Sequence, residues 1–224
     1  MSGFFWSALP YIAFATLIVG TSYRYWTGER GWSTKSSEFL AKKSLKVPIW
    51  LFHLGLLMAF GGHVIGILVP KSLTDGVGIS EHLYHIIALS GGIPAGILFF
   101  GGFFLLMQRR FGNPRMKVNT STMDGVIYAV LFVTIITGFG GTILNAVGLL
   151  GDEFNYRECI SPWFRSVLAM NPDASLMSET PIIFKCHVFM AMVTMILFPF
   201  TRLVHCLSLP FEMFLRSPII YRRK

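Results

Sequence analysis

The stretch Leu51–Pro70, LFHLGLLMAFGGHVIGILVP, decides the fold, because it runs for twenty residues without Asp, Glu, Lys or Arg. A helix needs about 20 apolar residues to cross the hydrocarbon core of a bilayer. Two histidines, His53 and His63, interrupt the apolar pattern. An imidazole at membrane depth is costly without a partner, so its presence there favours a functional role. The stretch therefore predicts a membrane-spanning helix whose two histidines have a functional role.

The composition of the whole chain supports a membrane protein. Of 224 residues, 53% are hydrophobic and only 13% are charged, and the net charge is +8. A soluble domain carries about 25% charged residues, so a soluble enzyme, a disordered chain and a disulfide scaffold are excluded. The charges lie in short segments between long apolar runs, which argues against nucleic acid as the partner of the basic residues.

Five apolar runs have the length of a membrane span, and together they predict an all-α integral membrane bundle of five transmembrane helices. We read residues 1–224 as one domain with a C-terminal tail over 210–224. The predicted spans are 4–23, 47–69, 83–107, 125–150 and 181–209. The long connection 151–180 is expected to hold a short interfacial helix. Tryptophans near the span ends fit an interfacial belt; they are Trp26, Trp32, Trp50 and Trp163.

The distribution of Lys and Arg predicts the orientation of the bundle. Segment 22–48 holds six of these residues and segment 108–122 holds four, whereas segment 71–82 has one and segment 151–180 has two. Basic residues concentrate in cytoplasmic loops. We therefore expect the N-terminus outside and the C-terminus in the cytoplasm.

Four of the six histidines fall inside apolar spans and form two pairs in this topology. The second and fifth helices are antiparallel, so His53 should lie opposite His205 near the cytoplasm, and His63 opposite His187 further out. Histidine is a common axial ligand of haem iron. Two bis-histidine haems, one above the other, would thus bridge the two helices.

The spacing of the pairs leaves a mismatch. His187 and His205 are eighteen residues apart, five full turns of a helix, and would share one face. Eighteen residues rise about 27 Å, whereas the ten residues from His53 to His63 rise only about 15 Å. Helix tilt, a kink at Pro199 or oblique axial bonds must absorb the difference, and the sequence leaves these three open.

The haem type follows from the cysteines. None of Cys159, Cys186 and Cys206 lies in a C-x-x-C-H motif, which leaves b-type haem. Zinc or copper would need three or four ligands at one point, and these histidines spread over two levels. The glycines on the second helix either admit a porphyrin or pack helices together; they are Gly55, Gly62 and Gly66.

The chain resembles the gamma subunit of respiratory nitrate reductase, in particular its Gram-positive branch. The similarity lies in Leu51–Pro70, in FPFTRLVHCLSLP (Phe198 to Pro210), in RYWTGERGWSTKSSEFL after the first helix and in RRFGNPR after the third. The stretches GISEHLYH and PDASLM fit that branch closely, and the histidine spacings of ten and eighteen match the family.

The resemblance implies a quinol-oxidising membrane anchor of a three-subunit enzyme in the bacterial cytoplasmic membrane. His53 and His205 would ligate the inner haem, and His63 and His187 the outer haem. Electrons from menaquinol or ubiquinol would pass through two b haems to a cytoplasmic iron–sulfur beta subunit, and then to a molybdenum-containing alpha subunit that reduces nitrate. Protons would leave on the outer side. The tail after Leu209 would dock the beta subunit.

By the same resemblance, the quinol site lies beside the outer haem. Gly62, His82 and His85 are the candidates for it, with Lys71 and Glu81 weaker. A lysine serves this pocket in part of the family, but GISEHLYH has none, so either a histidine or another residue is expected to substitute. The alternative for both histidines is that they face lipid headgroups at the interface.

Three arginines are candidates for pairing with haem propionates, namely Arg202, Arg109 and Arg110. The alternative is the ordinary positive-inside signal of a cytoplasmic loop, which we favour for the last two.

Other functions remain open from the residues alone. One is a related cytochrome b subunit of another membrane reductase. Another is a metal or proton transporter that uses the histidines. A bare structural anchor would not need four paired histidines.

Overall fold

The computed structural model describes residues 3–27, 44–150 and 154–207, so the predicted tail over 210–224 and Trp32 lie outside the described residues. No strand occurs in these ranges. Among the described residues, five helices are long and apolar enough to cross a membrane, which confirms the predicted bundle; they cover Phe4–Thr27, Lys46–Leu68, Glu81–Gly112, Thr122–Ala146 and Ile182–Phe200.

The five long helices carry the labels α1, α2, α4, α6 and α8. Their bounds are α1 (Leu9–Thr27, after the π-helical turn η1, Phe4–Ala8), α2 (Lys46–His63, continued by η4, Val64–Leu68), α4 (Glu81–Gly112), α6 (Thr122–Ala146) and α8 (Ile182–Leu197). Shorter elements join them: α3 (Lys71–Gly76), α5 (Pro114–Lys117), α7 (Ile160–Leu168), η5 (Ala174–Met177), η6 (Phe198–Phe200) and η7 (Arg202–Leu207).

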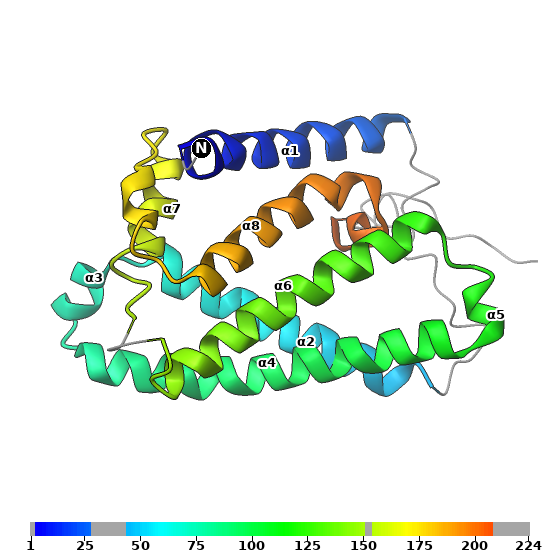
Figure 1. The fold of residues 1–224 in the computed structure, drawn as a ribbon, viewed down its shortest axis with the longest axis horizontal. Coiled ribbons are helices and arrows are strands. Elements are labelled where there is room, and N and C mark those ends of the chain that lie inside the picture. The colour runs from blue at the N-terminus through cyan, green and yellow to red at the C-terminus, as the bar shows by residue number, and fades with distance from the viewer. Residues whose placement is uncertain (1–2, 28–43, 151–153, 208–224) are drawn as a thin grey trace, which may run out of the picture.

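Neighbouring helices pack in the order α2, α4, α6, α8 and α1. The start of the first span (η1), α3 and α7 lie at one end of the bundle, and α5 lies at the other end (Figure 1). The backbones of α2 and α8 are not a closely packed pair, although the bundle brings the two helices to face each other. Following the orientation predicted from the basic residues, we refer below to the end with α3 and α7 as the outer end, and to the end with α5 as the inner end.

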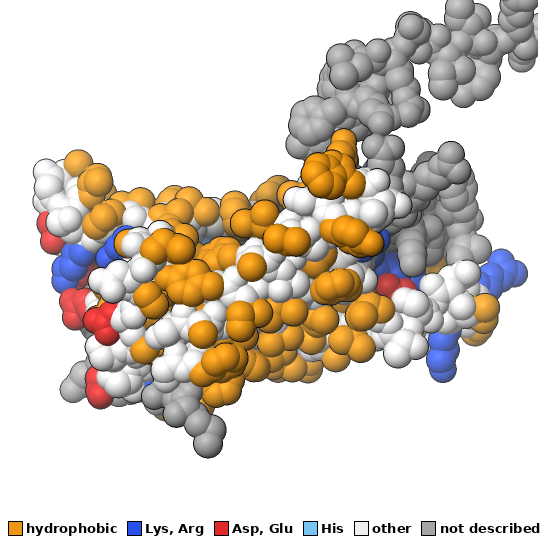
Figure 2. Space-filling model, turned by 90° about the horizontal axis from the view of Figure 1, so that it is seen from above, with side chains coloured by type: hydrophobic (Ala, Val, Ile, Leu, Met, Phe, Trp, Pro, Cys, Tyr) orange, Lys and Arg blue, Asp and Glu red, His pale blue; other side chains and the backbone are white. Residues whose placement is uncertain are grey.

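Charged side chains gather at the two ends of the molecule. Figure 2 shows an apolar middle on the face it presents, with acidic and basic side chains at either end. Such a band keeps charges out of the hydrocarbon core, where each one is costly. The arrangement agrees with a multi-pass membrane protein.

Local signals in the connections fix where the helices start and stop. The Ser80 side chain caps α4 by accepting a hydrogen bond from the Leu83 amide. Ser121 and Asp124 form a capping box at the start of α6, in which each side chain accepts from the other's backbone N–H. Beyond the end of α6, Gly148 adopts φ +73°, a left-handed conformation that costs glycine little.

The fifth span departs from the prediction of one helix over 181–209. Helix α8 ends at Leu197, and 3₁₀ turns follow on both sides of Thr201, whose backbone is extended at φ −117° and ψ −179°. Proline at position 199 has no N–H to continue the helical ladder. The Arg24 guanidinium of α1 donates to the carbonyl oxygens of Pro199 and Thr201, at 2.6 and 2.9 Å. His187 and His205 therefore do not share one face of one helix, and a break at Pro199, one of the three alternatives, is present.

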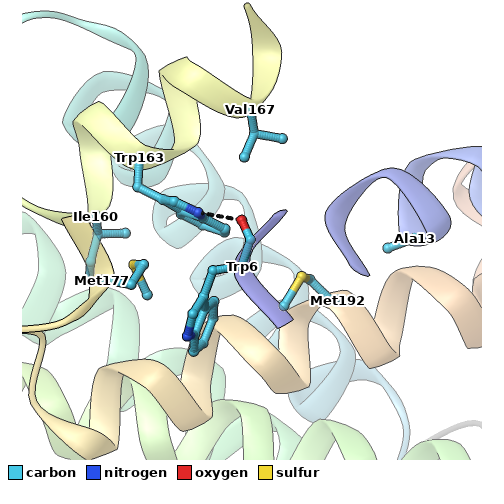
Figure 3. Close-up of a cluster of buried hydrophobic side chains, with 7 residues drawn as sticks. All are labelled: Trp6, Ala13, Ile160, Trp163, Val167, Met177 and Met192. Atoms are coloured by element: carbon cyan, nitrogen blue, oxygen red, sulfur yellow. Dashed lines mark hydrogen bonds between the residues drawn. The ribbon is translucent and has the colours of Figure 1, made fainter. Parts of the chain in front are cut away.

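The predicted short helix of the outer connection is present as α7, and it carries part of the core. Trp163 on α7 is only 2% exposed, and its Nε1 donates to the Trp6 carbonyl oxygen at 2.8 Å (Figure 3). The prediction that Trp163 belongs to an interfacial belt was wrong, because the connection folds back and buries the indole against Trp6. Trp26, at 85% exposed, and Trp50, at 67%, do lie on the surface.

Candidate functional site

The outer pair of membrane histidines faces across the interface between α2 and α8. The rings of His63 and His187 have centroids 5.9 Å apart and planes inclined by 34°. His63 is the last residue of α2, and His187 lies in the second turn of α8. The antiparallel pairing predicted from sequence therefore brings these two rings together.

The inner pair lies at the opposite end of the same interface. The rings of His53 and His205 have centroids 6.4 Å apart and planes inclined by 75°. His53 comes from the third turn of α2, whereas His205 comes from η7, beyond the break after α8. Both pairs are thus formed, although by a different path of the chain than a straight fifth helix would give.

Each of the four imidazoles is held by a backbone carbonyl at its Nδ1 atom. The acceptors are the carbonyl oxygens of Ile49 for His53 at 2.9 Å, Ala59 for His63 at 2.6 Å, Thr134 for His187 at 2.9 Å and Arg202 for His205 at 2.6 Å. A carbonyl oxygen can only accept, so Nδ1 carries the proton in a neutral ring and Nε2 keeps its lone pair. Ring orientation of this kind is the usual support of a metal-ligating histidine.

The ring separation within each pair is compatible with a metal ion held between two imidazoles. Metal–nitrogen bonds of about 2 Å on opposite sides of one ion place the two ring centroids about 6 Å apart. The observed separations of 5.9 and 6.4 Å agree with that value. Over the described ranges, no three His, Cys, Asp or Glu side chains converge on one point, so the histidines offer two ligands at each level. Two opposed protein ligands are the number that a haem iron takes when the protein fills both of its axial positions.

A glycine on α6 makes room for the outer pair. An ideal Cβ atom on Gly138 would lie 2.5 Å from Cε1 and 2.8 Å from Nδ1 of His187. The imidazole therefore rests directly on the backbone of α6, where its Nδ1 donates to Thr134. Sequence reasoning missed this residue, because nothing in the TGFGG stretch of α6 signals which glycine faces a histidine.

The three glycines of the second span have different surroundings. A Cβ on Gly55 would strike the backbone of Phe99 on α4, and one on Gly66 would lie 3.0 Å from the Tyr156 hydroxyl. The helix-packing interpretation therefore holds at Gly55, whereas Gly66 packs against a side chain of the connection before α7. Gly62 has no heavy atom within 4 Å of its ideal Cβ position, so space is open beside His63.

The other predicted quinol-site residues lie at the outer end, at the start of α4. His82 is exposed and His85 is half-buried. Both belong to the first two turns of the helix, at the same end of the bundle as His63 (Figure 1). Their role in quinol binding stays a prediction.

A polar network that the sequence did not indicate lies at the outer end of the bundle. The buried Arg157 guanidinium donates to Glu81 at 3.2 Å and to the Thr74 hydroxyl at 2.7 Å, and it lies 3.8 Å from the centroid of the Tyr84 ring. This network joins α3, α4 and the connection before α7. Its members come from segments far apart in sequence, so no sequence motif predicts the network.

Two further residues extend this network to the weaker quinol-site candidates. Lys71 donates to Glu158 at 3.0 Å and lies 3.5 Å from Glu81, and the hydrogen bond to Glu158 raises the pKa of its ammonium group. The Tyr156 hydroxyl donates to that of Tyr84 at 3.4 Å, and burial raises the pKa of the Tyr156 phenol. Lys71 and Glu81 thus have protein partners at the surface of the outer end.

The predicted propionate-pairing arginines lie at the inner end and contact protein groups. Arg110 and Arg202 both bind Asp124, at 3.1 and 2.8 Å, and the Arg109 Nε donates to the Ser44 hydroxyl at 3.1 Å. Pairing with a propionate stays a prediction for all three.

Comparison with known proteins gives consistent matches along the whole chain. A family model described as nitrate reductase gamma subunit matches residues 2–224. The nitrate reductase gamma chain of Bacillus subtilis (strain 168) is 42% identical over 225 residues, which cover 100% of both chains. The respiratory nitrate reductase 1 gamma chain of Escherichia coli (strain K12) is 30% identical over 222 residues, 99% of this chain and 97% of the relative. The nitrate reductase-like protein NarX of Mycobacterium tuberculosis (strain CDC 1551 / Oshkosh) is 38% identical over 224 residues, 100% of this chain but 34% of the relative.

Proposed function

Since the chain belongs to the nitrate reductase gamma subunit family, and is thus a membrane subunit of nitrate reductase, we propose that it oxidises quinol and carries the electrons across the membrane. The electrons pass to a cytoplasmic iron–sulfur beta subunit and from there to a molybdenum-containing alpha subunit. Nitrate chemistry takes place in that partner and not in this chain.

The observation that carries the proposal is the pair of facing imidazoles at each end of the interface between α2 and α8. His63 and His187 would hold one b haem, and His53 and His205 a second. When bound, these groups supply one-electron redox chemistry at iron. The four carbonyl acceptors hold each ring with Nε2 free of a proton, so the chain presents its ligands ready for binding.

Quinol oxidation needs a group that takes protons close to the outer pair. His82 and His85 lie at the start of α4 at this end, and an imidazole titrates near physiological pH. Gly62 leaves open space beside His63, where a flat quinol ring can approach the backbone. We place quinol, as menaquinol or ubiquinol, in this region, with its protons released outside.

The orientation of the proposed reaction follows the basic residues. The end with α5 carries Arg109, Arg115 and Lys117, which we assign to the cytoplasm under the positive-inside rule. The beta subunit would dock at this end of a bundle in the bacterial cytoplasmic membrane. Electrons then move inward while protons leave outward, so the step is electrogenic.

The test separates quinol oxidation from nitrate reduction in the assembled enzyme. His63→Ala and His187→Ala should abolish nitrate reduction driven by quinol, because each removes a ligand of the outer pair. Reduction driven by artificial dyes, which feed the partner subunits directly, should stay at the wild-type rate. Phe60→Ala, at an exposed apolar position on the same helix as His63, is the matched control and should leave both rates intact. Retained quinol-driven activity in the histidine variants would overturn the proposal, as would loss of dye-driven activity.

A further inference from the structure

A buried carboxylate joins three elements at the inner end of the bundle. Asp124, in the first turn of α6, is 5% exposed and lies between two guanidinium groups. Its Oδ2 accepts from Arg110 at 3.1 Å, and its Oδ1 accepts from the Arg202 Nε at 2.8 Å. Arg110 ends α4 and is itself 4% exposed, whereas Arg202 begins η7. One carboxylate therefore ties the last turn of α4 and the first turn of α6 to the segment that follows the break in the fifth span.

Arg202 also contacts His205 of the inner pair. The carbonyl oxygen of Arg202 accepts the hydrogen bond from His205 Nδ1 at 2.6 Å. Arg202 thus binds Asp124 with its side chain and His205 with its backbone. Arg202 is thus the single residue between Asp124 and the His205 imidazole. The centroid of this ring lies 6.4 Å from that of His53.

Arg24 holds the start of the segment that carries His205, at the Thr201 carbonyl oxygen, and Asp124 holds the Arg202 side chain. Within the described residues this segment is built of 3₁₀ turns, whose hydrogen bonds are poorer than those of an α-helix. Removal of one partner from a buried ion pair leaves an uncompensated charge, which is strongly destabilising at that place. The Asp124 carboxylate is therefore suited to fix where η7 lies, and not merely to cap α6.

We propose that Asp124 is the positioning residue of the inner haem site: through Arg202 it fixes the place and orientation of His205 opposite His53. The inference rests on the proposed function, because it requires the inner pair to be a haem site. It assigns a role in electron transfer to an acidic side chain that touches neither ligand.

Two effects on the inner site follow from this role. Loss of the carboxylate releases η7, so the His205 ring takes other orientations and the inner site binds its haem less fully. Loss of a negative charge near the inner site also favours the reduced form, so the midpoint potential of that site rises. The outer pair lies at the other end of the bundle and is expected to keep its potential.

The experiment compares Asp124→Asn and Asp124→Glu with wild type in the membrane-bound three-subunit complex. Haem content is measured by pyridine haemochrome, and the potentials by redox titration with low-temperature electron paramagnetic resonance of the oxidised haems. His205→Ala identifies which signal belongs to the inner site. Asp75→Asn, the same chemical change at an exposed position in α3 at the outer end, is the matched control.

We expect Asp124→Asn to shift the inner signal and raise its potential or to lose the inner haem, with the outer haem unchanged. Asp124→Glu, which keeps the charge, should restore the inner potential towards the wild-type value. An Asp124→Asn variant with wild-type inner signal and potential would overturn the role of Asp124. Equal loss of both haems would overturn it too, because the effect would then be on the whole bundle. Wild-type complex without haem in this chain would instead contradict the proposed function itself.

Discussion

The imidazole of His187 rests on the bare backbone of Gly138, where an ideal Cβ atom would come within 2.5 Å of the ring. The His187 ring must approach the α6 backbone this closely because its Nδ1 donates to the carbonyl oxygen of Thr134, one turn earlier on α6. α6 therefore packs against the side of the His187 ring and holds it in place. The orientation of His187 towards His63 is thus set by a helix that contributes no ligand.

Gly138→Ala is expected to displace His187 from the α6 backbone. The added methyl group cannot fit within 2.5 Å of an aromatic ring, so the ring must move and its bond to Thr134 must weaken. We expect loss of the outer haem or a shift of its midpoint potential, with the inner haem retained, as measured by redox titration of the haem spectrum. Gly140→Ala is the control on the same helix, since its Cβ would meet Ile183 at an ordinary 3.7 Å. Equal spectra for the two variants would contradict this role of Gly138.

Arg24→Ala is expected to loosen the break in the fifth span. The variant removes two hydrogen bonds, to the carbonyl oxygens of Pro199 and Thr201. Hydrogen bonds from a charged donor contribute about 1.5–3 kcal/mol each, so the free energy of unfolding should fall by a few kcal/mol. Thermal unfolding in detergent measures this loss. Arg115→Ala, at an exposed site on α5, should change the melting temperature little, and a similar change in both variants would speak against the anchoring role.

Trp163→Ala is expected to be one of the most damaging single changes at the outer end. The indole is buried between α7 and the start of the chain and donates to the Trp6 carbonyl (Figure 3). Truncation of a buried Trp to Ala costs about 3–5 kcal/mol. Trp163→Phe should cost less, because it keeps much of the packing and loses one hydrogen bond. Melting temperatures in detergent rank the variants, with exposed Trp26→Ala as the neutral control; a neutral Trp163→Ala would show that α7 is dispensable for stability.

Alkaline pH is expected to destabilise the outer connection through Tyr156. Burial raises the pKa of this phenol above its ordinary 10.0, so the folded state favours the protonated form. A raised pKa adds stability that is fully present below the unfolded pKa of about 10 and is lost as the pH rises beyond it. Tyr156→Phe should therefore flatten the fall in melting temperature between about pH 9 and about pH 11. Exposed Tyr23→Phe should leave the slope unchanged; a wild-type slope in Tyr156→Phe would refute the assignment.

The sequence predicted the spans and the histidine pairing well, because both depend on patterns within single segments. Apolar runs near the thickness of a bilayer mark the helices, and antiparallel order decides which histidines lie at equal depth. The break after α8 was only one of three alternatives. Proline permits it, but the Arg24 contacts that hold it come from a helix 175 residues away in the chain.

The features that the sequence did not predict depend on contacts between distant segments. Trp163 looks like an interfacial residue until α7 folds onto Trp6. Asp124 was not singled out in the sequence, because its pairing with Arg110 and Arg202 depends on how three helix ends meet. Gly138 is one of several glycines on α6, and only the packing of α8 selects it.

The measurement that most directly tests the account is the dithionite-reduced minus oxidised spectrum of the purified chain, with a pyridine haemochrome count. The four facing histidines predict two b-type haems per chain. Correctly folded protein without haem would contradict the account and would favour a transporter that uses the same histidines.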